Sequence, residues 1–191
     1  MTKKIALFGS GSGSNAENIC RYFSKSSSVN VVLICTNNPT SFIVTRAKKL
    51  SIPVVFITKE TLVDFSALKK TLLLAKIDLI VLAGFLLKIP PVMINSYPNK
   101  IINIHPSLLP KYSGKGMYGN HIHRQVLKNK ESETGISIHF VNEEYDKGEL
   151  VLQKKCLVSK KETLGSLVVK IRRLEFDYFP PTIEKILNSL H

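Results

Sequence analysis

Short apolar runs and segments of helical periodicity alternate along the first half of the chain. The apolar runs are rich in Val, Ile and Leu and are typical of buried strands; they cover residues 5–8, 29–35, 54–57, 77–83 and 101–105. Segments with apolar side chains at helical spacing lie between them, at residues 15–24, 41–50 and 62–75 and in a short stretch that ends at Tyr97. This alternation predicts an α/β fold with a single doubly wound, mostly parallel, Rossmann-like sheet.

The pattern changes after Pro110. Residues 111–119 hold three glycines and predict a mobile loop. The elements expected after it are a helix to Lys128, strands at residues 134–141 and 150–158, and a long C-terminal helix from Glu162 to about Tyr178 that breaks at Pro180-Pro181. No linker, internal repeat or low-complexity segment interrupts the sequence, so we expect a single domain spanning residues 1–191.

Composition places the chain among ordinary globular proteins, with 44% hydrophobic and 21% charged residues. No apolar run reaches the roughly 20 residues that a membrane-spanning helix needs, and the first strand is too short for a signal peptide. Cys20, Cys35 and Cys156 are widely spaced and form no metal or redox motif. These features predict a cytoplasmic protein without a membrane partner.

The chain is strongly basic, since 27 Lys and Arg against 14 Asp and Glu give a net charge of +13. Such a charge indicates an anionic partner. The lysines are scattered in short pairs, and the aromatic–basic alternation of an RNA-binding sheet is absent. Small phosphorylated or polycarboxylate ligands therefore explain the charge as well as nucleic acid does, and a basic nucleic-acid-binding module stays open as an alternative.

A glycine-rich loop follows the first strand and consists of Gly11, Ser12, Gly13, Ser14 and Asn15. Glycines let the backbone approach a ligand, and the free N–H groups at the start of the next helix favour an anion. The loop formally matches a dinucleotide fingerprint, but the second strand ends in Thr36-Asn37-Asn38 without the acid that would hold a ribose, and no Gly-Lys-Ser/Thr follows. A site for one phosphate remains, with a bare strand–helix turn as the alternative.

Two polar residues, Asn103 and His105, interrupt the apolar run 101–105. Their spacing puts both side chains on the same face of a strand, and Pro106 ends that strand. Ligands of open α/β sheets bind at this carboxyl edge. The alternative is a core strand with two satisfied polar groups. A metal is not expected, because His121 and His123 do not share a helix face and no further ligand stands at a suitable spacing.

Residues 103–110, Asn-Ile-His-Pro-Ser-Leu-Leu-Pro, resemble the folate-dependent formyltransferases, as do Gly135-x-Ser-x-His139 and Asp146-x-Gly148 downstream. The resemblance covers nearly the whole chain. It implies the formyltransferase fold, 10-formyltetrahydrofolate as co-substrate, glycinamide ribonucleotide as formyl acceptor, and no metal. The site residues that it implies are Asn103, His105 and Asp146 for catalysis; Gly11, Ser12, Gly13, Ser14, Asn15 and Glu175 for the substrate; and Leu86, Leu87, Lys88, Ile89, Asn142, Glu143, Glu144 and Asp146 for the cofactor.

The implied chemistry suits these residue types. Asn103 and a protonated His105 would stabilise the negative oxygen of a tetrahedral intermediate, and Asp146 would favour the imidazolium and relay a proton. A local reading of Asp146 alone makes it only a turn residue. The sequence departs from relatives by extra residues at 114–119 and by Leu87-Lys88 where an Arg is common.

Other folate-dependent formyl enzymes remain alternatives within the resemblance. They are a formyltetrahydrofolate deformylase, an amino-sugar formyltransferase and the enzyme that formylates methionyl-tRNA. The last carries an added C-terminal domain and the first an added N-terminal domain, and neither is expected here. The expected protein is a monomer or a homodimer.

Overall fold

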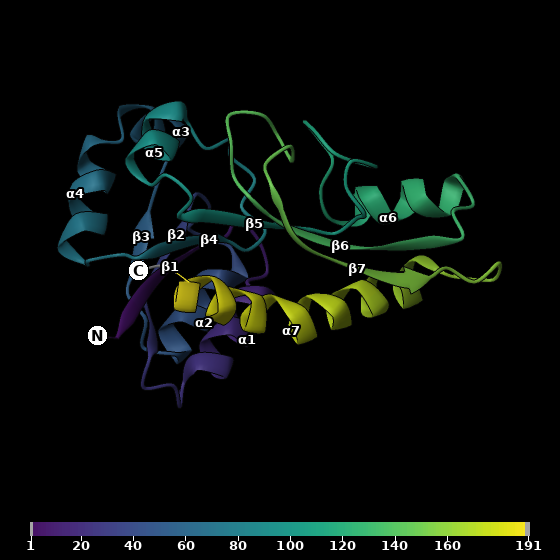
Figure 1. Ribbon diagram of the computed structural model, residues 1–191, viewed down its shortest axis with the longest axis horizontal. Coiled ribbons are helices and arrows are strands. Elements are labelled where there is room, and N and C mark those ends of the chain that lie inside the picture. The colour runs from purple at the N-terminus through teal and green to yellow at the C-terminus, as the bar shows by residue number, and fades with distance from the viewer. Residues whose placement is uncertain (1, 190–191) are drawn as a thin grey trace.

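The computed structural model describes residues 2–189, and in them the chain forms a seven-stranded sheet with the order β3-β2-β1-β4-β5-β6-β7 (Figure 1). Five strands run parallel: β1 Lys3–Phe8, β2 Val29–Thr36, β3 Val54–Phe56, β4 Leu79–Leu82 and β5 Ile101–His105. The last two, β6 Glu133–Phe140 and β7 Leu150–Leu157, pair antiparallel at the β5 edge. The predicted doubly wound, mostly parallel sheet is therefore confirmed.

Helices cover both faces of this sheet. One apolar core lies under α1 Ser14–Phe23, α2 Phe42–Lys49, α6 Gly119–Lys128 and α7 Leu164–Ser189. The other lies under α3 Lys59–Asp64, α4 Ser66–Leu74 and α5 Pro91–Ser96. Strand β1 shows why both faces need a cover, because Ile5 and Leu7 enter the first core while Ala6 and Phe8 enter the second.

The helix predicted over residues 62–75 is wrong in one respect, because two helices occupy this stretch. Phe65 separates α3 from α4 and adopts a left-handed backbone conformation with φ 50°. Its side chain is buried in the second core. Burial of the aromatic ring offsets the cost of the left-handed backbone. The spacing of apolar residues does not show that the helix is interrupted here.

The predicted break of the C-terminal helix at Pro180-Pro181 is also wrong. Helix α7 continues through both prolines to Ser189. A proline removes the N–H that would bond the carbonyl four residues earlier. For Pro180 that carbonyl belongs to Phe176, and it accepts a hydrogen bond from Asn18 Nδ2 at 3.1 Å instead. Phe179 and Ile183 are fully buried on either side of the prolines, and this packing favours the continuous helix.

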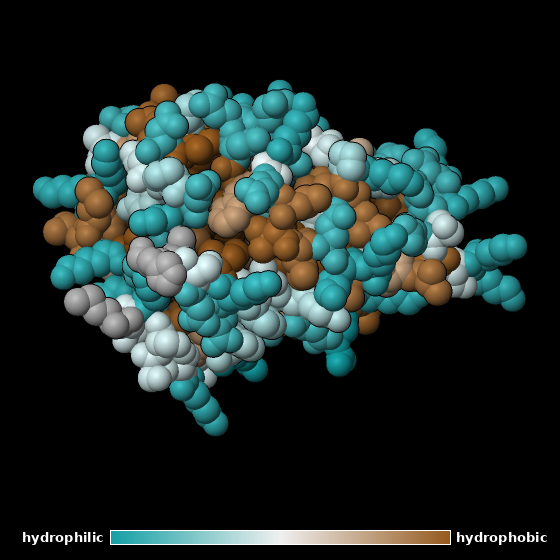
Figure 2. All heavy atoms as spheres, viewed as in Figure 1, coloured by the Kyte–Doolittle hydropathy of each residue, from teal (hydrophilic) through white to brown (hydrophobic). Residues whose placement is uncertain are grey.

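Apolar and hydrophilic side chains both occupy the face of the molecule seen in Figure 2. Figure 2 shows apolar side chains gathered across the middle of one face, with hydrophilic side chains around them. Between residues 2 and 189, no helix is both long and apolar enough to cross a membrane.

Candidate active site

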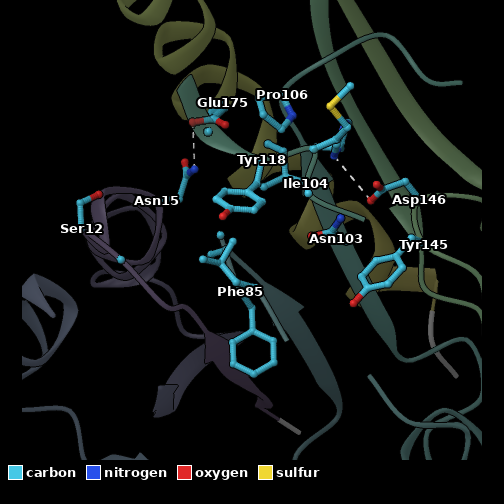
Figure 3. A pocket seen from close by; sticks show the side chains of 18 of the residues that line it. Ser12, Asn15, Phe85, Asn103, Ile104, Pro106, Tyr118, Tyr145, Asp146 and Glu175 are labelled. Atoms are coloured by element: carbon cyan, nitrogen blue, oxygen red, sulfur yellow. Dashed lines mark hydrogen bonds and ion pairs between the residues drawn. The ribbon is translucent and has the colours of Figure 1, made fainter. Parts of the chain in front are cut away.

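A cavity of about 620 Å³ opens at the carboxyl ends of β1, β4 and β5, where the loops after these strands meet α7 (Figure 3). This is the edge at which parallel sheets bind ligands. It brings together the three predicted catalytic residues, the whole predicted substrate loop, Glu175 and Leu86. The lining residues are 11–15, 83–86, 103–106, 114–119, Tyr145, Asp146 and Glu175.

Asn103 points into the cavity from β5, and His139 of the neighbouring strand β6 orients it. The two residues are directly opposed in the antiparallel register. His139 Nδ1 lies 2.7 Å from the Phe140 carbonyl, to which only an N–H can donate, so its Nε2 is the acceptor. Asn103 Nδ2 donates to this Nε2 at 3.0 Å. The amide nitrogen keeps its second N–H for a ligand oxygen in the cavity.

His105 has a defined tautomer. Its Nε2 donates to the Tyr112 carbonyl at 2.8 Å, which leaves Nδ1 facing Asp146 Oδ1 at 3.5 Å. Burial lowers the pKa of the imidazole, and the attraction of Asp146 and the bond to Tyr112 offset this effect only in part. Burial thus opposes the protonated His105 that the resemblance implies for the intermediate, while the Asp146 carboxylate favours it.

Asp146 lies in the turn between β6 and β7, and its side chain reaches His105 of β5. The resemblance implied this proximity. It has φ 56°, a left-handed conformation that Asp tolerates better than most residues. Its Oδ2 accepts a hydrogen bond from the Gly114 N–H at 3.0 Å, and Oδ1 also lies 3.8 Å from His139 Nε2. Burial raises the pKa of this carboxyl, but His139 and His105, when they carry a proton on the nitrogen that faces it, and the Gly114 N–H together lower it below its usual value. Asp146 is thus held as a carboxylate.

The glycine loop turns from β1 into α1, and its shape depends on Gly13. This residue has φ 73°, and a Cβ there would lie 2.7 Å from Ile43 Cγ1 and 2.8 Å from Ile43 Cα. By contrast, a Cβ on Gly11 would meet nothing within 4 Å. Arg46 Nε donates to the Ser12 carbonyl at 2.9 Å, and its guanidinium also pairs with Glu17 in the first turn of α1. The Ser14 N–H, the first of α1, lies 3.4 Å from Ser12 Oγ, and N–H groups at the start of a helix favour an anion.

Asn15 and Glu175 join α1 to α7 at the cavity wall (Figure 3). Asn15 Nδ2 donates to Glu175 Oε2 at 2.9 Å, and the buried Asn15 Oδ1 has no partner. Burial raises the pKa of the Glu175 carboxyl, although Asn15 and Arg172 partly offset this. A buried amide oxygen without a partner is rare in native proteins, and a ligand hydroxyl in the cavity would satisfy it.

A second cavity of about 70 Å³ adjoins the first and shares Phe85, Asn103, Tyr145 and Asp146 with it. Six of the predicted cofactor residues line it, namely Leu87, Lys88, Ile89, Asn142, Glu144 and Asp146. Lys88 Nζ lies 5.6 Å from the centre of the Tyr145 ring. Glu143 lines neither cavity, so the structure does not bring it to the predicted cofactor site.

Sequence reasoning missed several cavity residues, and His139 is the most consequential. It stands within the quoted motif, but its contact with Asn103 depends on the β5–β6 register, which is not readable from either strand alone. Tyr118 and Phe85 also line the cavity (Figure 3), and each lies beside a glycine in a loop. Aromatic residues in glycine-rich loops at a sheet edge are a weak signal that would have found them.

Among residues 2–189, no group of three or more His, Cys, Asp or Glu side chains is placed to hold a metal ion. His121 is exposed while His123 is buried, as expected for residues that do not share a helix face. The three cysteines are free thiols.

Comparison with known proteins identifies the family. Residues 3–183 match the family model described as formyl transferase. A phosphoribosylglycinamide formyltransferase of Bacillus subtilis is 30% identical over 191 residues, which cover 97% of this chain and 95% of the relative. A chloroplastic phosphoribosylglycinamide formyltransferase of Arabidopsis thaliana is 35% identical over 193 residues, covering 98% of this chain but only 66% of the plant protein.

A solved structure agrees with these sequence relatives. The crystal structure of phosphoribosylglycinamide formyltransferase from Bacillus halodurans has a TM-score of 0.87 and 31% identity, covering 99% of this chain and 97% of that chain. The family match includes β1 to most of α7, and with it every residue of the two cavities. The chain belongs to the formyl transferase family.

Proposed function

We propose that this chain transfers the formyl group of 10-formyltetrahydrofolate to the amine of glycinamide ribonucleotide, a step of de novo purine (IMP) biosynthesis. One observation carries the proposal. The Asn103, His105 and Asp146 side chains converge in the first cavity, between the glycine loop and the second, smaller cavity. The names of the relatives, phosphoribosylglycinamide formyltransferases in bacteria and plants, support the choice of substrate.

The phosphorylated substrate fits the side of the cavity formed by the loop Gly11–Asn15. Backbone N–H groups at the start of α1 would bind its phosphate, and the unpartnered Asn15 Oδ1 and the Glu175 carboxyl would bind its ribose hydroxyls. The pterin ring fits the opposite side, against the backbone at Leu86–Ile89 and the turn at Asn142–Asp146. The amine and the formyl carbon would then meet at Asn103 and His105.

Asn103 supplies a donor to the formyl oxygen. As the amine attacks the formyl carbon, that oxygen gains negative charge, and an N–H already aimed at it stabilises the transition state by about 3–4 kcal/mol. The bond from Asn103 Nδ2 to His139 fixes the amide plane, so little reorganisation is needed when the charge develops.

His105 and Asp146 manage the proton. In the free protein His105 is neutral with its lone pair on Nδ1, so it can take the proton that the attacking amine loses. The resulting imidazolium faces the Asp146 carboxylate, which stabilises it. The Nδ1–H of this imidazolium stabilises the tetrahedral oxygen. It then delivers its proton to N10 of the folate as the bond between N10 and the formyl carbon breaks. The formyl group thus passes directly between the two nitrogens, without a covalent enzyme intermediate.

We further propose that the reaction takes place in the cytoplasm, needs no metal or nucleic acid, and is carried out by a monomer or a homodimer. The main proposal is tested by mixing the purified protein with each substrate alone and with both, and following the absorbance of the folate. The proposal expects a change only when both substrates are present. Equal turnover of the folate with water alone would assign a deformylase instead, and no turnover in either case would refute formyl transfer.

A further inference from the structure

Ser10 lies directly before the glycine loop and is bonded to the loop that follows β4. The Leu86 N–H donates to Ser10 Oγ at 2.9 Å, and the Ser10 N–H donates to the Gly84 carbonyl at 3.0 Å. Only 6% of Ser10 is exposed, and it does not line either cavity. One residue therefore joins the substrate loop after β1 to the segment Gly84–Leu86 that lines the cavity.

Asn37 sets the direction of the Ser10 hydroxyl. Ser10 Oγ donates its one proton to Asn37 Oδ1 at 2.5 Å, so it can only accept from Leu86. Asn37 follows β2, at the position where a dinucleotide-binding fold places its ribose-binding acid. In this chain Asn37 has a different role, because its Oδ1 accepts the hydrogen bond from the Ser10 hydroxyl, which lies between the loops after β1 and β4.

We propose that Ser10, oriented by Asn37, is a positioning residue for the cofactor wall of the active site. The chain of hydrogen bonds from Asn37 through Ser10 to Leu86 places the Leu86 peptide, and with it the backbone that follows, at a fixed distance from the substrate loop. The inference rests on the proposed function, because it assumes that this backbone binds the pterin. It adds a residue that touches neither substrate but sets the distance between their two sites.

Loss of the Ser10 hydroxyl should act selectively. Without it the Leu86 N–H has no acceptor and the loop after β4 is less well defined, which weakens cofactor binding. The loop Gly11–Asn15 keeps its own determinants, namely the Gly13 conformation, its packing on Ile43 and the bond from Arg46. We expect Ser10→Ala to raise the KM for 10-formyltetrahydrofolate about tenfold, the usual scale for one hydrogen bond. The KM for glycinamide ribonucleotide should stay within about twofold of wild type.

Asn37 provides a graded test of the orientation. Asn37→Leu keeps the approximate size but removes the acceptor, and should raise the cofactor KM in the same direction by about threefold to fivefold. Asn37→Asp keeps an acceptor oxygen for the Ser10 proton and should restore nearly wild-type behaviour. Ser41→Ala is the matched control, because Ser41 is also a buried serine of this region and its hydroxyl donates to the Asn38 carbonyl at 2.6 Å, away from both cavities.

The experiment measures kcat and both KM values for wild type and the four variants, together with binding of 5-formyltetrahydrofolate by calorimetry and thermal stability. A rise of the cofactor KM and Kd in Ser10→Ala and Asn37→Leu, but not in Ser41→Ala, supports the inference. Equal behaviour of Ser10→Ala and Ser41→Ala, or a parallel rise of both KM values, overturns it while the proposed function stands. A wild-type protein that neither binds the folate nor transfers formyl refutes the proposed function itself.

Discussion

At the scale of single residues, Asp146 is the side chain whose charge bears most on the proposed chemistry. Asp146→Asn keeps the side-chain shape and tolerates the left-handed backbone of this position, but it removes the charge beside His105. The pKa of His105, already lowered by burial, should fall further, because the Asp146 carboxylate is the largest factor that raises it. Turnover should drop by roughly 10²–10⁴, with little change in substrate binding. NMR titration of His105 and steady-state kinetics measure both effects.

The contradicting results for this prediction are specific. An unmoved pKa of His105 would show that Asp146 is only a turn residue. His105→Asn should be about as damaging as Asp146→Asn, and the double variant should be little worse than either, because groups that act as a unit are non-additive. Full additivity of the two losses would separate their roles.

Residues whose role follows from local strand periodicity could be predicted from the sequence, whereas roles that depend on strand pairing or burial could not. Asn103 and His105 follow from strand periodicity, since two polar groups on one face of an apolar strand need partners or a ligand. His139 depends on pairing with a strand that lies far along the chain, so its role was not readable. The environment of His105 was not readable from the sequence, because neither the approach of Asp146 nor the burial that lowers the pKa of the imidazole follows from the strand pattern.

At the scale of elements, the glycine loop divides into a structural and a functional glycine. Gly13→Val would clash with Ile43 and perturb the fold, so it cannot isolate phosphate binding. Gly11→Val adds a side chain in open space at the cavity wall. We expect it to raise the KM for glycinamide ribonucleotide at least tenfold by blocking the close approach of the phosphate, with folate affinity nearly unchanged. An unaltered KM in steady-state kinetics would make the loop a plain turn.

The loop at residues 114–119 makes a second prediction at this scale. Its Gly114 N–H bonds Asp146, and the Tyr112 carbonyl just before it bonds His105, so loop position and catalytic geometry are linked. With three glycines at positive φ, the loop should exchange amide hydrogens quickly in the free enzyme and slowly when both substrates are bound. Hydrogen-exchange mass spectrometry measures this, and equal protection with and without ligands would argue against a lid.

Element prediction succeeded where the pattern was local. The strands and most helices follow from apolar runs and helical spacing, because both sheet faces are covered and each element buries its own stripe. It failed where a distant contact decides the outcome. Phe65 ends a helix because its ring is buried in the core. Pro180 has no N–H for the Phe176 carbonyl, and Asn18 Nδ2 donates to that carbonyl instead.

At the scale of the whole molecule, buried histidines link stability to pH. Burial lowers the pKa of His123 as well as that of His105, and His123 Nδ1 has no hydrogen-bond partner. A histidine whose pKa is lower in the folded state stabilises the fold above about pH 6.5 and loses this contribution as pH falls toward the folded value. The free energy of unfolding should therefore decrease between about pH 7 and pH 5. His123→Phe should flatten this slope in denaturant titrations, and an identical slope would exclude His123 as its source.

The most direct test of the central claim, direct formyl transfer within one cavity, is a single turnover with a ¹³C-labelled formyl group. Excess enzyme is mixed with labelled 10-formyltetrahydrofolate and glycinamide ribonucleotide, and the label is followed by NMR and rapid quench. We predict that loss of the folate formyl signal equals the gain of the formylated amine at every time, without formate, and that Asp146→Asn slows both together by at least about a hundredfold. Labelled formate, or label attached to the protein, would contradict it.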